Sequence, residues 1–102
     1  MRHLSITAVG VLRSIADGFK YGFDIIDTTG LPSGTVYPAL SRLERDGYVR
    51  SAWEDERHAH QEGRPARRYY RVTAAGARAL EAALTHYRSL LPAIGAPGRQ
   101  QP

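Results

Sequence analysis

The spacing of apolar residues predicts two helices at the start of the chain. His3 to Ala16 contains an amphipathic stripe made of Leu4, Ala8, Val11, Leu12 and Ile15. A shorter apolar segment from Tyr21 to Thr29 is followed by Gly30, a residue type that commonly ends a helix. We therefore expect one long helix and one short helix, separated by the turn at Asp17-Gly18.

A third helix is predicted from Gly34 to Asp46, with Ser33 as its N-cap and Gly47 just beyond its end. On a helical wheel its apolar residues share one face, which we expect to be buried: Val36, Ala39, Leu40 and Leu43. The opposite face has no acid on its central arc and consists of Gly34, Pro38, Ser41, Arg42 and Arg45, flanked by Thr35 and Tyr37. Serine and arginine can read base edges or hold phosphates, although an exposed helix face also looks like this by default.

Beyond Gly47 the pattern changes to the alternation typical of strands. Tyr48–Trp53 and Arg67–Val72 are two predicted strands of a hairpin, joined by a long polar loop that contains Gly63 and Pro65. Thr73 then caps a fourth helix that reaches about Leu91 and is stopped by Pro92. The predicted fold class is mainly α with a β-hairpin wing: a winged helix-turn-helix followed by a C-terminal dimerisation helix.

Composition excludes several classes of protein. The chain has 102 residues, of which 42% are hydrophobic and 24% charged, as expected for one folded domain. It has no cysteine, so disulfide frameworks and thiolate sites are excluded. The sequence shows no secretory signal, no apolar run near the roughly 18 residues of a membrane span, and no nucleophile, phosphate-loop or zinc-protease motif. We expect a cytoplasmic protein that is not an enzyme, has no cofactor and does not bind a membrane.

The positive charge of the chain is concentrated. The formal net charge is +4, and Lys20 is the only basic residue besides arginine. An acid-free stretch between Gly63 and Arg78 carries Arg64, Arg67, Arg68, Arg71 and Arg78. Guanidinium groups suit phosphate because they stay charged and bind oxygens in pairs, whereas the simpler interpretation is a solvated basic surface.

Two further patterns have a functional and a simpler interpretation. His58 and His60 would share a face of an extended segment, with Glu56 and Glu62 nearby, but a solvated surface is the expected outcome and no metal site is predicted. In the fourth helix, apolar residues at alternating spacings of three and four form a seam for a second copy of the chain, or for packing within the chain: Ala77, Leu80, Leu84, Tyr87 and Leu91.

Short motifs from about residue 4 to residue 90 match a known family in their order. The third helix contains Gly-Thr-x-Tyr-Pro-x-Leu, and the later Gly-Arg-Pro and Tyr-Tyr-Arg make the combination specific. The matching segments are Tyr21–Ile26, Ser33–Glu44, Asp46–Val49, Trp53-Glu54, Gly63-Arg64-Pro65, Arg68–Thr73 and Gly76. In this pattern the sequence resembles the PadR-type transcriptional regulators, and specifically their short subfamily with a single C-terminal helix.

The resemblance implies a bacterial, dimeric DNA-binding repressor with a winged-helix domain in residues 1–72, a dimerisation helix in 73–92 and a flexible tail in 93–102. Its partners would be a pseudopalindromic DNA operator, a second copy of the chain and an unidentified small-molecule effector. The predicted DNA-binding residues are Ser33, Gly34, Thr35, Tyr37, Pro38, Ser41 and Arg42 on the third helix, and Arg64, Arg67 and Arg68 on the wing. The alternatives are a winged-helix module that binds a protein, or an effector- or metal-responsive sensor whose output is DNA binding.

Overall fold

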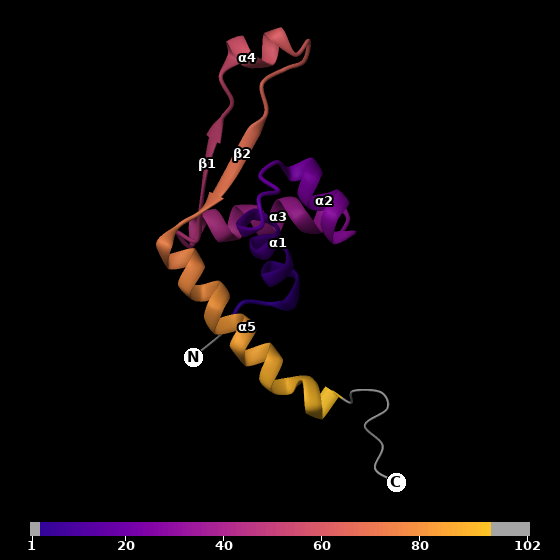
Figure 1. Cartoon of the computed structure of the whole chain (residues 1–102), viewed down its shortest axis with the longest axis vertical. Helices are drawn as coiled ribbons and strands as arrows, with labels where there is room; N and C mark the ends of the chain where they lie inside the picture. Colours follow the sequence, from indigo (N-terminus) through magenta and orange to yellow (C-terminus); the bar gives the residue numbers. More distant parts are fainter. Residues whose placement is uncertain (1–2, 95–102) are drawn as a thin grey trace.

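A computed structural model of the chain describes residues 3–94 and contains, within that range, five helices and a two-stranded antiparallel hairpin (Figure 1). The elements, in order, are α1 (Ile6–Ala16), α2 (Gly22–Thr29), α3 (Ser33–Arg45), β1 (Val49–Trp53), α4 (Glu56–Gln61), β2 (Arg68–Val72) and α5 (Ala74–Ile94). The order of three helices, a hairpin and a C-terminal helix confirms the predicted fold class.

The boundaries of the first three helices follow from their capping residues. Helix α1 begins at Ile6 and not at His3, because the Ser5 hydroxyl accepts a hydrogen bond from the Ala8 amide at 3.2 Å. Helix α3 begins one residue earlier than predicted: Pro32 is its N-cap and Ser33 its first helical residue. The prediction of Ser33 as the cap is therefore wrong, whereas Gly47 has the predicted positive φ, at 79°.

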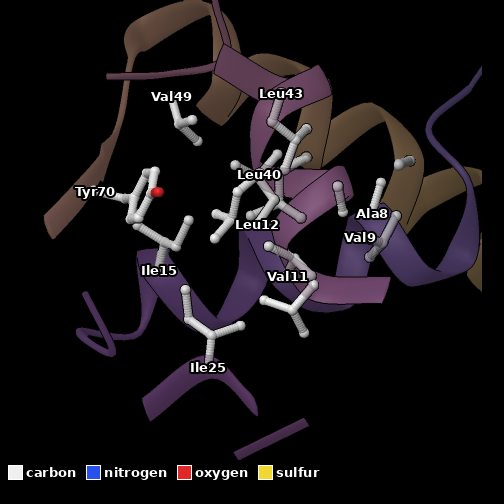
Figure 2. Packing of buried hydrophobic residues seen from close by; sticks show 14 residues of the cluster. Ala8, Val9, Val11, Leu12, Ile15, Ile25, Leu40, Leu43, Val49 and Tyr70 are labelled. Atoms are coloured by element: carbon white, nitrogen blue, oxygen red, sulfur yellow. The ribbon is translucent and has the colours of Figure 1, made fainter. Parts of the chain in front are cut away.

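The core lies where α1, α2 and α3 meet the base of the hairpin (Figure 2). The predicted apolar face of α3 is buried as a whole, from Val36 to Leu43, and it packs on Val11 and Leu12 of α1. Tyr70 from β2 and Leu80 from α5 belong to the same cluster. The outer face of α3 is thus fixed in position by the burial of the opposite face.

The wing differs from the prediction at its far end. Strands β1 and β2 pair in register from Val49 opposite Val72 to Trp53 opposite Arg68. The segment between them contains the short helix α4 in place of the extended polar loop that the sequence predicted (Figure 1). Helix α4 forms because the Asp55 carboxylate caps it, accepting a hydrogen bond from the Arg57 amide at 2.8 Å.

Helix α5 starts as predicted and ends later than predicted. Thr73 caps it, with its hydroxyl accepting from the Gly76 amide at 3.0 Å. The helix passes through Pro92 to Ile94, since a proline in the last turn removes one amide donor without preventing helical φ angles. The first two residues of the predicted tail, 93 and 94, therefore belong to α5. Residues 95–102 lie outside the described residues. Within the described range, no helix has the length and apolar character needed to cross a membrane.

Candidate nucleic-acid interface

The outer face of α3 is open to solvent over its whole length. Seven residues of this face are exposed, and Thr35 is half-buried; the exposed residues are Ser33, Gly34, Tyr37, Pro38, Ser41, Arg42 and Arg45. Arg45 forms an ion pair with Asp46, whose carboxylate lies 3.5 Å from its Nε. Within residues 3–94, Arg42 has no ion-pair partner. The face therefore presents short hydroxyls and a guanidinium that is available to a ligand.

Tyr37 also joins α3 to α2. A Cβ added at Gly22 would lie 2.6 Å from the Tyr37 ring, so glycine is required for the ring to cross the start of α2. Tyr37 as a whole is 47% exposed. Tyr37 was predicted only as a residue that faces DNA. The structure adds a packing contact between α2 and α3, which the sequence pattern does not indicate.

Glu54 organises the far end of the hairpin, where strand β1 leads into the segment of α4. Its buried carboxylate accepts hydrogen bonds from both terminal nitrogens of Arg64, from the Arg67 amide at 3.2 Å and from the Tyr21 hydroxyl at 3.4 Å. The hydrogen bond from the Arg64 guanidinium is the main reason why the pKa of Glu54 falls from its ordinary 4.5 to about 2. We call Tyr21, Glu54, Arg64 and Arg67 the Glu54 cluster.

The three predicted wing arginines therefore have partners inside the chain. Arg64 is held by Glu54, and its side chain is only 26% exposed. Arg67 stacks over the Tyr21 ring at 3.8 Å, with its Nη2 3.6 Å from the Glu54 carboxylate. Arg68 donates to the Ser51 hydroxyl at 2.7 Å and to the Glu44 carboxylate at 3.3 Å, which ties the hairpin to α3. Arg67 and Arg68 remain about half exposed, at 45% and 46%, and their contact with DNA stays a prediction.

An aromatic groove lies between the wing and the start of α2. Phe23, Trp53, Tyr37 and Arg68 line this groove. Phe23 is 75% exposed and Trp53 is 67% exposed. The Trp53 side chain is open to solvent, whereas Tyr70, from the same hairpin, is buried in the core.

The predicted dimerisation seam is divided between the core and the surface. Leu80 is buried, and Leu84 and Tyr87 pack against the core, where the Tyr87 hydroxyl donates to the Leu4 carbonyl at 2.6 Å. Ala77 and Leu91 are exposed. The first half of α5 therefore packs within the chain, and its role in dimerisation stays a prediction.

His58 and His60 do not share a face. They lie on helix α4, where residues two apart point to different sides, so the expectation of a common extended face is wrong. In the described part of the chain, no group of three or more histidines and acidic residues is arranged to hold a metal ion.

Comparison with known proteins identifies a family and a fold. The profile of the transcriptional regulator PadR-like family matches residues 11–82. A PadR family transcription regulator from Clostridium difficile superposes with a TM-score of 0.75 at 22% identity, covering 89% of this chain and 100% of that chain. No curated protein sequence gives a match.

Two further solved structures agree. A PadR-like transcriptional regulator from Bacillus cereus has a TM-score of 0.74 at 18% identity, covering 94% of each chain. A transcriptional regulator from Clostridium thermocellum has a TM-score of 0.70 at 24% identity, covering 86% of this chain and 85% of that chain. At these identities the likeness establishes the shared winged-helix fold.

Proposed function

The chain belongs to the transcriptional regulator PadR-like family, and from this premise we propose that it is a homodimeric repressor which reads a pseudopalindromic operator with the outer face of α3. The family consists of DNA-binding regulators and not of enzymes. The observation that carries the proposal is the exposed, acid-free arc of α3 with Arg42 unpaired among the described residues. A duplex offers phosphates and base edges that can accept hydrogen bonds from the side chains of this arc.

Each part of α3 has a proposed task. Its 13 residues give a rod of about 20 Å, which fits along a major groove. Arg42 donates a pair of hydrogen bonds to a guanine edge, the commonest specific contact in such complexes. Gly34 and Pro38 leave the first turns without bulk, so that the helix N-terminus approaches a phosphate. The other proposed contacts to the groove come from this arc and its flanks, through Ser33, Thr35, Tyr37 and Ser41.

The wing supplies backbone contacts. The side chains of Arg67 and Arg68 remain about half exposed after making their internal contacts, and we assign them to phosphates beside the groove. Arg64, the least exposed of the three, contributes chiefly by holding Glu54 and through it the wing.

The second copy of the chain is assigned to the far half of α5. Leu90 and Leu91 are 38% and 56% exposed there, beyond the part of the helix that packs on the core. Covering these side chains with a partner's α5 removes apolar surface from water. Two α3 helices related by a dimer axis would then enter major grooves about 34 Å apart, the repeat of the duplex. The division into a DNA-binding domain at 1–72 and a dimerisation helix at 73–92 follows from this arrangement.

Fluorescence anisotropy tests the proposal. The protein is titrated into duplexes from its own upstream region and into scrambled duplexes, at several salt concentrations. We expect a site preferred by roughly 10³-fold or more. Arg42→Ala should weaken binding to that site by about 1–3 kcal/mol and relax its sequence preference.

The control for Arg42 is Arg78→Ala, which removes the same charge from an exposed position on α5. This variant should retain the preference of the wild type for the specific duplex. Equal, weak and salt-sensitive binding of the wild type to all duplexes would refute the proposal and favour a module that binds a protein. The repressor role is tested separately with a reporter under the upstream promoter, whose transcription should rise when the gene is deleted.

A further inference from the structure

Two arginines face each other directly across the hairpin. The register of β1 and β2 pairs Arg50 with Arg71, and both side chains are exposed. Their neighbours Val49 and Tyr70 are buried on the core side, so alternation along the strands puts the two arginines on the outer side. Residues paired in this way have Cβ atoms about 4.5–5.5 Å apart.

This pair differs from the other wing arginines in having no counter-charge. Arg64 and Arg67 share the single negative charge of Glu54, and Arg68 pairs with Glu44. Among the described residues, neither Arg50 nor Arg71 forms an ion pair. Like charges directly opposite one another destabilise a hairpin, so the free chain holds an unfavourable arrangement at this position.

A hollow beside the pair reaches the end of α3. It is lined by Arg50, Arg71 and Tyr69 from the hairpin and by Glu44 and Gly47 from the end of α3. Glu44 is the acid in this hollow, and its two carboxylate oxygens accept from Ser51 at 2.6 Å and from Arg68 at 3.3 Å. Both carboxylate oxygens of Glu44 are therefore engaged by residues other than the arginine pair.

We propose that Arg50 and Arg71 together bind backbone phosphates of the duplex whose groove is occupied by α3. The inference rests on the proposed function and adds to it the contact that anchors the base of the wing. Guanidinium groups grip phosphate oxygens through paired N–H donors, and an anion between the two side chains removes their mutual repulsion. The hollow connects this anion position with the helix that reads the bases.

The test is the salt dependence of DNA binding in Arg50→Gln, Arg71→Gln and the double variant. The slope of log K against log salt falls by about 0.9 for each phosphate that the protein no longer neutralises. At ~0.1 M salt this corresponds to about eight-fold weaker binding for each arginine, on specific and scrambled duplexes alike. Arg50→Lys keeps the charge and should keep the slope. The melting temperatures of the Gln variants should be unchanged or higher, because the repulsion is gone.

The matched control is Arg78→Gln, which removes an exposed charge from α5 that forms no ion pair among the described residues. A slope that falls as much in this variant would show an effect of net charge alone and overturn the inference. An unchanged slope in the double variant would also overturn it. If the double variant kept its salt slope on DNA but lost binding to polyglutamate, the arginine pair would bind an acidic protein.

The inference and the proposed function fail in different ways. The proposed function fails when the wild type prefers no duplex, whatever the salt slope is. The inference fails when substitution of Arg50 and Arg71 leaves the salt slope unchanged, even if Arg42→Ala abolishes the sequence preference.

Discussion

Gly76 lies in the first turn of α5, where that turn crosses the chain between α3 and β1. A Cβ added there would be 2.9 Å from the Tyr48 carbonyl carbon, closer still to its oxygen, and 3.0 Å from a methyl group of Val72. The carbonyl belongs to the backbone, so it cannot rotate away. The same oxygen accepts from the Thr73 amide at 3.0 Å, and the Thr73 hydroxyl donates to the Gly47 carbonyl at 2.7 Å. Gly76→Ala therefore perturbs the junction that fixes α5 on the domain.

Two effects of this substitution oppose each other. Alanine is favoured over glycine inside a helix by roughly 0.5–1 kcal/mol. Forcing a methyl group into a closely packed site costs roughly 1–3 kcal/mol. Moving the helix to make room also weakens the bond from Thr73 to Tyr48, which contributes about 1 kcal/mol. We expect a net loss of about 1–3 kcal/mol in the free energy of unfolding.

The assay is urea unfolding followed by circular dichroism, at one fixed chain concentration because a dimer would make stability concentration-dependent. The matched control is Gly10→Ala in α1, where nothing lies within 4 Å of the added Cβ. That variant should gain roughly 0.5–1 kcal/mol from helix preference alone. If Gly76→Ala were as stable as the wild type while Gly10→Ala behaved as expected, the close approach of α5 to Tyr48 would be refuted.

Three further predictions concern the Glu54 cluster and α5. Folding lowers the pKa of Glu54 from 4.5 to about 2, so its contribution to stability is present above pH 4.5 and is lost as the pH falls towards 2. Glu54→Gln should therefore flatten this acid dependence of the free energy of unfolding, measured by urea titrations between pH 2 and 7. Tyr87→Phe loses the hydrogen bond to Leu4 and should cost about 1 kcal/mol by the same assay, and an unchanged stability would contradict it. Leu91→Glu should convert a dimer to a monomer in sedimentation velocity, whereas Ala82→Glu, at another exposed position of α5, should leave the dimer intact.

The faces of α3 could be predicted from the sequence because hydrophobic periodicity is set by geometry alone. Four apolar positions repeat at the helical period, and all four are buried, from Val36 to Leu43. The hairpin was predicted for the same reason. Helix α4 was missed because six residues carry too little periodicity, although Asp55 was available as a cap. The end of α5 is predicted too early because a proline commonly stops a helix, whereas the fixed φ of Pro92 is compatible with helical geometry and α5 continues to Ile94.

The pairing of charges could not be predicted from the sequence. Arg64 lies ten positions from Glu54, and their contact requires the hairpin to bring both segments together. In the sequence pattern, Glu54 and the arginine stretch are two separate features. The contact between Tyr37 and Gly22 escaped detection in the same way, since it depends on the angle at which α2 crosses α3.

This pairing changes where the positive charge acts. Arg64, Arg67 and Arg68 have carboxylate partners in the fold, whereas Arg42, Arg50 and Arg71 have none among the described residues. On the proposed function, charge without a carboxylate partner therefore faces DNA from α3 and from the outer side of the hairpin. Arg64 holds the wing in place, whereas Arg67 and Arg68 do both. The two roles are separable by experiment. Loss of a holding arginine lowers stability together with binding, whereas loss of a contacting arginine lowers binding and its salt dependence at unchanged stability.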